Sequence, residues 1–331
     1  MRKIFLTMLA AVSLLGCNKD DAPITPQEQH AISFGTVDTR AGLSDLKANG
    51  FGVWTVINND VVQNKILMDN QLVEYNEAEG WHYSPVQHWI KNTKFTFMST
   101  YPYDENGTYF SYNSEKTAVE LKVSETPSQV DFLMATNVVE KSDNGYPATV
   151  NPQFKHMLTS VGLKIWRDQA KHTNDQMRIK SVTLGNIRKG GTITSTADSW
   201  TYGNDKLTIE KVYDSFSDDD NIGAATIKDD GSMETGGIAA NPFGDMMLLP
   251  QALDDSNVVS LKIVYELKRQ NAADWEEAEL ETSLPSIVWA SGQRYTYNVV
   301  LSSVTDITVY YIQTKVDPWG TPQVGGTVII K

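Results

Sequence analysis

The residues best suited to catalysis or metal binding have no spacing typical of either role. The chain has five histidines: His30, His82, His88, His156 and His172. None belongs to an H-E-x-x-H arrangement, which places two imidazoles on one metal ion. No pair of carboxylates and no Ser/His/Asp set can be singled out by spacing, although such sets need not be local. We therefore expect no catalytic residue, no metal site and no cofactor, and we expect His156 to make a structural hydrogen bond.

One acidic run could attract a hard cation. Asp218, Asp219, Asp220 and Asn221 lie close in sequence to other aspartates, namely Asp214, Asp229 and Asp230. Clustered oxygen atoms suit calcium. However, Ile222 stands where another ligand would be needed, and no glutamate closes the loop. The pattern favours a solvated acidic loop within a longer irregular stretch at 215–237.

The single cysteine, Cys17, follows a short apolar leader. Basic residues precede the apolar run at 4–15, which is too short to span a bilayer and is typical of a secretory signal peptide. An exported protein with one cysteine forms no internal disulfide bond, so its thiol needs another role. The motif Leu14-Leu15-Gly16-Cys17 resembles the bacterial lipobox, whose cysteine is acylated. Residues 1–16 are thus predicted to be a lipoprotein signal peptide, and Cys17 to carry the acyl chains that anchor the protein.

The residues after Cys17 predict a targeting signal and a flexible tether. Lys19, Asp20 and Asp21 resemble the short tag that directs Bacteroidota lipoproteins to the cell surface. Residues 17–30 are polar, contain two prolines and are predicted to be a flexible tether. Together they predict an outer-membrane lipoprotein exposed at the cell surface. The alternative is an unmodified thiol beside an ordinary cleavage site.

The composition predicts an all-β protein. Aromatic residues make up 10% of the chain, and β-branched residues gather in short runs divided by Gly, Asn, Asp and Pro. No segment keeps a helical period, so any helix should be a brief insertion. The formal net charge of −13 argues against nucleic acid and anionic lipid as partners.

Short strands at regular spacing, without βαβ alternation, predict two β-sandwiches. The strongest break in mid-chain is the turn-forming run at 142–147, where we place the domain boundary. The predicted organisation is an N-terminal sandwich at 31–147 and a C-terminal sandwich at 148–331. The glycine-rich stretch at 185–191 lacks the Gly-Lys-Ser/Thr ending of a phosphate-binding loop and is predicted to be a hairpin turn.

An alternating segment at 31–38 precedes a basic residue. Ile32 and Phe34 would lie on one face of a strand, with Ser33 on the other. Arg40 follows, and a trypsin-like protease could cut between Arg40 and Ala41. The alternative is an ordinary exposed arginine in a turn.

Several motifs in order resemble the fimbrillin (Mfa-like) family of Bacteroidota over nearly the whole mature chain. They are mostly aromatic and turn residues, and their order and spacing carry the resemblance: Phe51-Gly52-Val53-Trp54, Trp81 with Tyr83 and Trp89, Phe95-Thr96-Phe97, Tyr101-Pro102, Asp131-Phe132-Leu133-Met134-Ala135, Phe154-Lys155-His156-Met157-Leu158, Met247-Leu248-Leu249-Pro250-Gln251, and Trp289-Ala290-Ser291-Gly292-Gln293-Arg294-Tyr295.

The resemblance implies two transthyretin-like, seven-stranded β-sandwich domains in tandem. It also implies a lipidated precursor, removal of the first strand by an arginine-specific protease, and assembly into surface pili. Carried onto this sequence, the cut falls between Arg40 and Ala41, and the removed strand holds Ile32 and Phe34. Another pilus subunit then fills the groove with a strand of its own, as in other cases of strand donation.

The candidate donor strands lie near the C-terminus. One is the segment at 307–316, with Val309 and Tyr311, and the other is the tail at 326–331, with Val328 and Ile330. Only a short tail follows Trp319, so a tip adhesin that accepts a strand without donating one stays an open interpretation beside a stalk subunit. A host or bacterial surface ligand is expected for an adhesin.

Two other functions stay open. The first alternative is a monomeric surface lipoprotein that binds glycans, with Trp200 or Trp275 as the best candidates for an exposed stacking residue. The least favoured alternative is an enzyme built on a β-sandwich.

Overall fold

The computed structural model describes residues 30–35, 43–141, 145–217, 220–228, 233–302 and 307–315. Within these residues the chain forms the strands β1 to β22 and one short helix, α1 (Leu43–Asn49). The prediction of an all-β protein is therefore confirmed, and α1 is the brief insertion expected. No helix among the described residues is long and apolar enough to cross a membrane.

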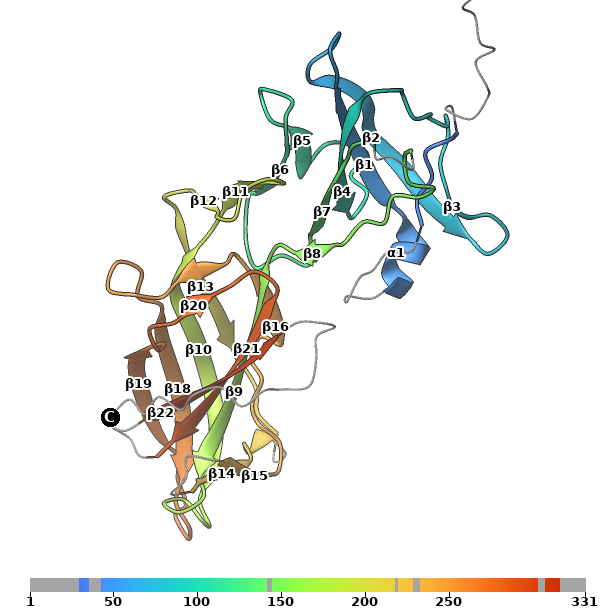
Figure 1. Cartoon of the computed structure of the whole chain (residues 1–331). Coiled ribbons are helices and arrows are strands. Elements are labelled where there is room, and N and C mark those ends of the chain that lie inside the picture. Colours follow the sequence, from blue (N-terminus) through green and yellow to red (C-terminus); the bar gives the residue numbers. More distant parts are fainter. Residues whose placement is uncertain are drawn as a thin grey trace, which may run out of the picture.

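The N-terminal half is built on one antiparallel six-stranded sheet (Figure 1). Its order is β3-β2-β1-β4-β7-β8. The strands are β1 (Phe51–Asn58), β2 (Lys65–Asn76), β3 (Gly80–His82), β4 (Lys94–Tyr101), β7 (Leu133–Val139) and β8 (Lys155–His156). Apolar residues point to both faces of β1, because Phe51 and Val53 join one core while Trp54 and Val56 join another. Both faces of this sheet must therefore be covered.

A four-stranded sheet covers the face that carries Trp54 and Val56. Its order is β12-β11-β6-β5, with β5 (Phe110–Tyr112), β6 (Val119–Val123), β11 (Gly191–Thr194) and β12 (Thr201–Tyr202). Strand β11 pairs with β6 from Gly191 opposite Val123 onward, so a hairpin from far along the chain completes the N-terminal sandwich. The boundary we placed between 147 and 148 stays a prediction. Any assignment of domains must nevertheless place residues 191–202 in the N-terminal sandwich.

The expectation of a hairpin turn at 185–191 was wrong. Strand β10 (Gln176–Arg188) runs through most of this stretch, because Val182, Leu184 and Ile187 are all buried in the C-terminal core. The chain then passes directly into the other sandwich. A side chain on Gly190 would lie 2.7 Å from the carbonyl oxygen of Ser124, so glycine is needed where the two backbones meet.

The C-terminal half contains two further sheets around one core. The first has the order β13-β10-β18-β19, with β13 (Lys206–Val212), β18 (Ser260–Lys268) and β19 (Glu276–Ser283). The second has the order β15-β14-β9-β21-β22, with β16 paired to β9. Its strands are β9 (Thr159–Asp168), β14 (Ala224–Ile227), β15 (Met233–Gly236), β16 (Asp245–Leu248), β21 (Gln293–Leu301) and β22 (Ile307–Lys315). A small pair, β17 (Gln251–Ala252) with β20 (Val288–Trp289), lies beside them.

Part of the stretch at 215–237 was wrongly expected to be irregular. Strands β14 and β15 form a hairpin within it, and β14 adds in parallel to the end of β9. The reason is the apolar run Ala224–Ile227, whose Ala225 packs against Trp166 and Val300. The acidic residues around this short apolar run led to the wrong expectation of an irregular segment.

The second face of the six-stranded N-terminal sheet is covered differently from the first. Its core contains Phe51, Phe97 and Val73, and the residues packed on them come from irregular segments and α1. These segments are the chain at 30–35, the connection between β3 and β4, and the connection between β7 and β8. The candidate functional site lies in this layer.

Candidate functional site

The segment at 30–35 is extended and hydrogen-bonded to the chain on both sides. On one side it runs antiparallel to residues 87–89, with Ala31 opposite His88. The main-chain N–H of Ile32 donates to the carbonyl of Gln87 at 2.8 Å, and the N–H of Trp89 donates to the carbonyl of His30 at 3.2 Å. We call residues 87–89 the first wall.

The opposite edge of the segment pairs with residues 148–151, which we call the second wall. Here the pairing is parallel, with Phe34 opposite Val150. The N–H of Val150 donates to the carbonyl of Ser33 at 2.8 Å, and the N–H of Gly35 donates to the carbonyl of Val150 at 3.0 Å. The Ser33 hydroxyl adds a hydrogen bond of 2.7 Å to the carbonyl of Ala148. Residues 30–35 therefore occupy a central position between two walls.

The two apolar side chains of the segment point into the core beneath it. Ile32 is 1% exposed and Phe34 is 4% exposed. The Phe34 ring meets three other rings edge-on, with centroid distances of 6.0 Å to Phe51, 5.6 Å to Tyr83 and 6.2 Å to Phe97. Edge-to-face contacts of this kind are favourable beyond the area they bury. The alternation expected at 31–38 is thus present over the described part, while residues 36–38 lie outside it.

Tyr83 joins the segment to the first wall. Its hydroxyl donates to the carbonyl of Ile32 at 2.8 Å and accepts from the N–H of Gln87 at 3.2 Å. Burial raises the pKa of Tyr83 above its ordinary value, because the phenolate would be poorly solvated, and the hydrogen bond with Gln87 only partly offsets this. The pKa of Tyr83 therefore depends on what covers it.

The connections that carry the two walls are also joined to each other without the segment, through residues in and next to the walls. The rings of Trp89 and Tyr146 stack at 4.8 Å with an interplanar angle of 7°. The Tyr146 hydroxyl donates to the carbonyl of Ile90 at 2.7 Å and accepts from the N–H of Thr93 at 2.9 Å. These contacts involve no atom of residues 30–35. These contacts would therefore remain if the segment left.

Removal of the segment would expose a groove with directional binding groups. The first wall would present the carbonyl of Gln87 and the N–H of Trp89, and the second wall would present both main-chain groups of Val150. The apolar sites of Ile32 and Phe34 would lie between them. Unpaired strand edges beside apolar sites form a template for another extended chain. Such a groove would be suited to an extended chain.

The other predicted site residues lie mostly outside the described part. These are Cys17, Lys19, Asp20, Asp21, Arg40, Ala41, Val328 and Ile330. Val309 and Tyr311 lie in β22, which pairs antiparallel with β21 along its whole length. In that sheet β22 is the last strand of the order.

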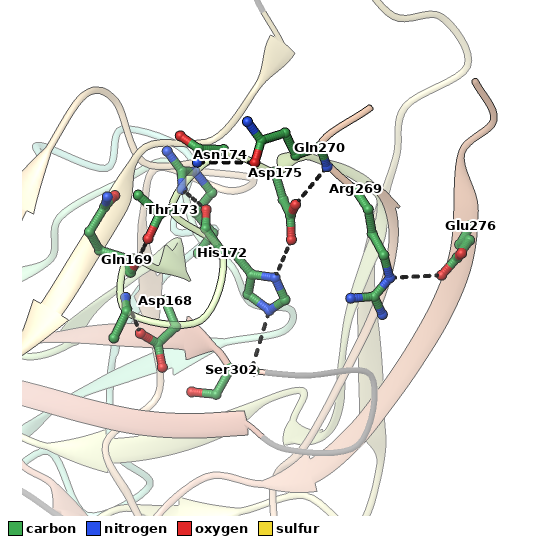
Figure 2. Close-up of polar contacts among 12 residues, drawn as sticks. Asp168, Gln169, His172, Thr173, Asn174, Asp175, Arg269, Gln270, Glu276 and Ser302 are labelled. Atoms are coloured by element: carbon green, nitrogen blue, oxygen red, sulfur yellow. Dashed lines mark hydrogen bonds and ion pairs between the residues drawn. The ribbon is translucent and has the colours of Figure 1, made fainter. Parts of the chain in front are cut away.

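His172 is the histidine with the most developed polar surroundings (Figure 2). Its Nδ1 lies 2.9 Å from a carboxylate oxygen of Asp175, and its Nε2 lies 3.2 Å from the main-chain oxygen of Ser302. In a triad of the Ser-His-Asp type the second nitrogen meets a nucleophile, and here it meets a carbonyl. The arrangement instead holds the loop after β9 against the end of β21.

Asp175 is stabilised as a carboxylate in this arrangement. Burial alone would raise its pKa, but the contact with His172 and the N–H of Gln270, which donates at 2.9 Å, outweigh that effect. The nearby charges of His172 and Arg269 act in the same direction. The pKa of Asp175 is therefore lower than its ordinary value.

His156 makes a close polar contact, and the structural hydrogen bond expected of it stays a prediction. Its Nδ1 lies 2.7 Å from a carboxylate oxygen of Asp131, and its side chain is nearly fully buried. Among the described residues, no group of three or more His, Cys, Asp or Glu side chains could hold a metal ion. Asp218, Asp219, Asp229 and Asp230 of the acidic run lie outside the described residues.

The tryptophans proposed for glycan stacking differ from the expectation. Trp200 is only 7% exposed, because the hairpin of β11 and β12 carries it into the N-terminal core. Trp275 is half-buried, and the guanidinium of Arg178 stacks on its ring at 4.1 Å from the centroid. The same guanidinium lies 4.1 Å from the Phe216 ring. Trp200 is therefore excluded as an exposed stacking residue in this conformation.

A comparison with models of known families finds one match, described as fimbrillin-like, over residues 39–319. The chain belongs to the fimbrillin-like family. A comparison with curated proteins gives no match. The resemblance stated from the aromatic and turn motifs is thus confirmed.

Several solved structures are similar to this chain. A fimbrial protein from Bacteroides vulgatus is 17% identical, with a TM-score of 0.61, over 87% of this chain and 99% of that one. A proposed cell adhesion protein from Bacteroides uniformis is 14% identical, with a TM-score of 0.49, over 89% of this chain and 99% of that one. The first likeness establishes a shared fold. The seven-stranded, transthyretin-like description of each fimbrillin-like domain stays a prediction.

Sequence reasoning missed the residues that hold the segment in this fimbrillin-like protein. They are Tyr83, Trp89, Tyr146 and the second wall. The motif Trp81, Tyr83 and Trp89 was a usable signal, since three aromatic residues so close together in sequence indicate that something packs there. The second wall, by contrast, has an ordinary turn-like sequence.

Proposed function

We propose that this fimbrillin-like protein is a surface-anchored pilus subunit or tip adhesin that accepts a strand from another subunit. In this proposal Cys17 carries the lipid anchor to the outer membrane, and Lys19, Asp20 and Asp21 direct the precursor to the cell surface. An arginine-specific protease cuts between Arg40 and Ala41. The segment with Ile32 and Phe34 then leaves, and a donor strand takes its place.

The observation that carries the proposal is the central position of residues 30–35. Four main-chain hydrogen bonds to two walls and two buried side chains hold this segment, and Arg40 follows it shortly in the sequence. Burying two such side chains contributes roughly 1.5–3 kcal/mol each, which is enough to keep the groove closed before cleavage. The uncut segment would thus prevent premature assembly.

The proposal can be tested on the mature chain with an arginine-specific protease. We expect one early cut at Arg40 and a stable remaining body that assembles or binds an added strand peptide. The matched control is Arg40→Ala, which should stay intact and monomeric under the same treatment. A cut protein that stays monomeric and binds no strand peptide would contradict the proposal.

Lipidation is tested separately, by mass spectrometry of the protein extracted from bacterial membranes. The wild-type chain should carry acyl chains on an N-terminal Cys17. The Cys17→Ser variant should lack them and appear in the soluble fraction. A wild-type N-terminus at any other residue would contradict this part of the proposal.

A second candidate function, glycan binding by the monomer, is favoured by one cavity. It has a volume of about 700 Å³ and lies between α1 and the ends of β4 and β7. Tyr101 and Tyr103 line it beside the polar groups of Asp45, Asn49 and Asp131. Aromatic faces and polar groups in one cavity suit a sugar. Glycan-array binding by the uncut protein, lost in Tyr103→Ala, would support this function.

A further inference from the structure

The last described residue of the segment, Gly35, has no room for a side chain. A Cβ atom there would lie 2.8 Å from the Thr149 hydroxyl oxygen and 3.0 Å from the Thr149 Cβ, and it would meet the Asn151 side-chain oxygen even more closely. Gly35 is not among the glycines with a positive φ. The requirement for glycine is therefore one of space, and the backbone conformation itself would accept an L-residue.

The atoms that close this space belong to the second wall, which is held in place from several directions. The Thr149 hydroxyl lies 3.4 Å from the Asn151 side-chain oxygen, and the Asn137 side chain donates to the Asn151 carbonyl at 3.2 Å. Val150, between them, is 2% exposed and pairs with the segment. The wall cannot move outward without breaking these contacts. An occupant must therefore be small at this position.

Three positions of the groove thus specify an occupant that runs in the direction of residues 30–35. The first, at Ile32, is a buried aliphatic site, and the second, at Phe34, is bounded by three aromatic rings. The third, at Gly35, has no space for a side chain unless the Thr149 and Asn151 side chains move, so it favours glycine. The corresponding pattern is aliphatic-x-aromatic-Gly.

The candidate donor segments of this chain do not have that pattern. Residues 307–316 contain no glycine, and Val309 and Tyr311 are followed by Ile312 where glycine is needed. In the tail, Val328 and Ile330 are followed by Lys331, and the one glycine of that tail, Gly326, precedes its apolar residues.

We infer that the groove selects its occupant through the space at Gly35, and that after cleavage this occupant is an aliphatic-x-aromatic-Gly strand of a different protein chain rather than residues 307–316 or 326–331 of a second copy of this one. The inference rests on the proposed strand-acceptor function and adds the identity of the partner by its sequence pattern. Thr149 and Asn151 are the residues that determine this specificity.

Peptide binding to the cut protein tests the inference. The mature chain is cut at Arg40, and fluorescein-labelled peptides are added while fluorescence anisotropy is recorded. The reference peptide spans residues 30–38. Its Gly35→Ala version should bind at least tenfold more weakly, whereas its Ala31→Val version, changed at an exposed position, should bind within about threefold of the reference. A peptide of residues 307–316 should bind at least tenfold more weakly than the reference.

A complementary protein variant distinguishes lost space from other effects of alanine. Thr149→Ala combined with Asn151→Ala removes both oxygen atoms that would meet the new methyl group. This double variant should bind the Gly35→Ala peptide within about threefold of the reference peptide. If the double variant no longer binds the reference peptide, its wall has moved, and the comparison of peptides on the wild-type protein decides alone.

The outcomes separate this inference from the function on which it rests. Equal binding of the reference and Gly35→Ala peptides would overturn the glycine selection and leave strand acceptance intact. Tight binding of the 307–316 peptide would overturn the exclusion of a second copy. Failure of every peptide to bind the cut protein would overturn strand acceptance, and the glycine selection with it.

Discussion

Phe34→Ala in the uncut chain is the sharpest test of how residues 30–35 are held. Phe34 is 4% exposed and meets three aromatic rings edge-on, so truncation leaves a cavity in the second N-terminal core. Replacing a buried phenylalanine by alanine costs about 3–5 kcal/mol. The walls have their own contacts through Trp89 and Tyr146, so the loss should fall mainly on closure of the groove.

This free-energy change shifts the equilibrium between the closed groove, with residues 30–35 in place, and the open groove. Because about 1.4 kcal/mol corresponds to a factor of ten, the open fraction should rise between about a hundredfold and a few thousandfold. Hydrogen exchange measures it at the amides of Ile32 and Gly35, which are hydrogen-bonded only when the segment is in place. Their protection should fall by the same factor.

Phe110→Ala is the matched control for this experiment. Phe110 is 1% exposed and packs edge-on against Phe132 in the other N-terminal core, at a centroid distance of 6.0 Å. The Phe110→Ala variant should lower the melting temperature about as much as Phe34→Ala does. It should change hydrogen exchange at the amides of residues 30–35 only a little. Loss of protection under tenfold in Phe34→Ala, or an equal loss in both variants, would refute local anchoring by Phe34.

Three further predictions concern single side chains. Tyr83→Phe should weaken closure of the groove by about 0.5–1.5 kcal/mol, because the hydrogen bond to the Ile32 carbonyl is lost. In spectrophotometric titration, the raised pKa of Tyr83 should fall towards 10 when the segment is removed. An unchanged titration would show that the segment does not cover Tyr83. Because its pKa is lowered on folding, Asp175 contributes stability that is complete above the unfolded pKa, near 4, and is lost as the pH falls through the lower folded pKa. Asp175→Asn should therefore lower the urea midpoint at pH 7, and this loss should shrink steadily as the pH falls below the unfolded pKa. An equal loss at every pH would contradict stabilisation of the Asp175 carboxylate by its contacts with His172 and Gln270. Asp104 accepts three main-chain N–H groups of the turn before β5 and is buried, so Asp104→Ala should cost about 1–3 kcal/mol in chemical unfolding, whereas the exposed Glu105→Ala should change little.

Local patterns were sufficient for the class of fold and for much of the candidate strand. The alternation of Ile32 and Phe34 depends only on the period of an extended chain, so it could be predicted without knowledge of the partners. The fimbrillin-like family could likewise be recognised from aromatic and turn motifs in order. The residues that were misjudged are those whose partners are distant in sequence. Trp200 is one of them, because the hairpin of β11 and β12 pairs with β6 and carries Trp200 into the N-terminal core.

The sequence by itself determined an all-β protein and an apolar segment before Arg40, because strand periodicity and composition are properties of neighbouring residues. Only the tertiary structure decided that this segment is central, between walls that come from separate connections, and that Gly35 must be glycine. The reason is that hydrogen-bond partners and available space are set by residues far along the chain, such as His88 and Thr149. Nothing in the sequence indicates that these residues contact the segment at 30–35.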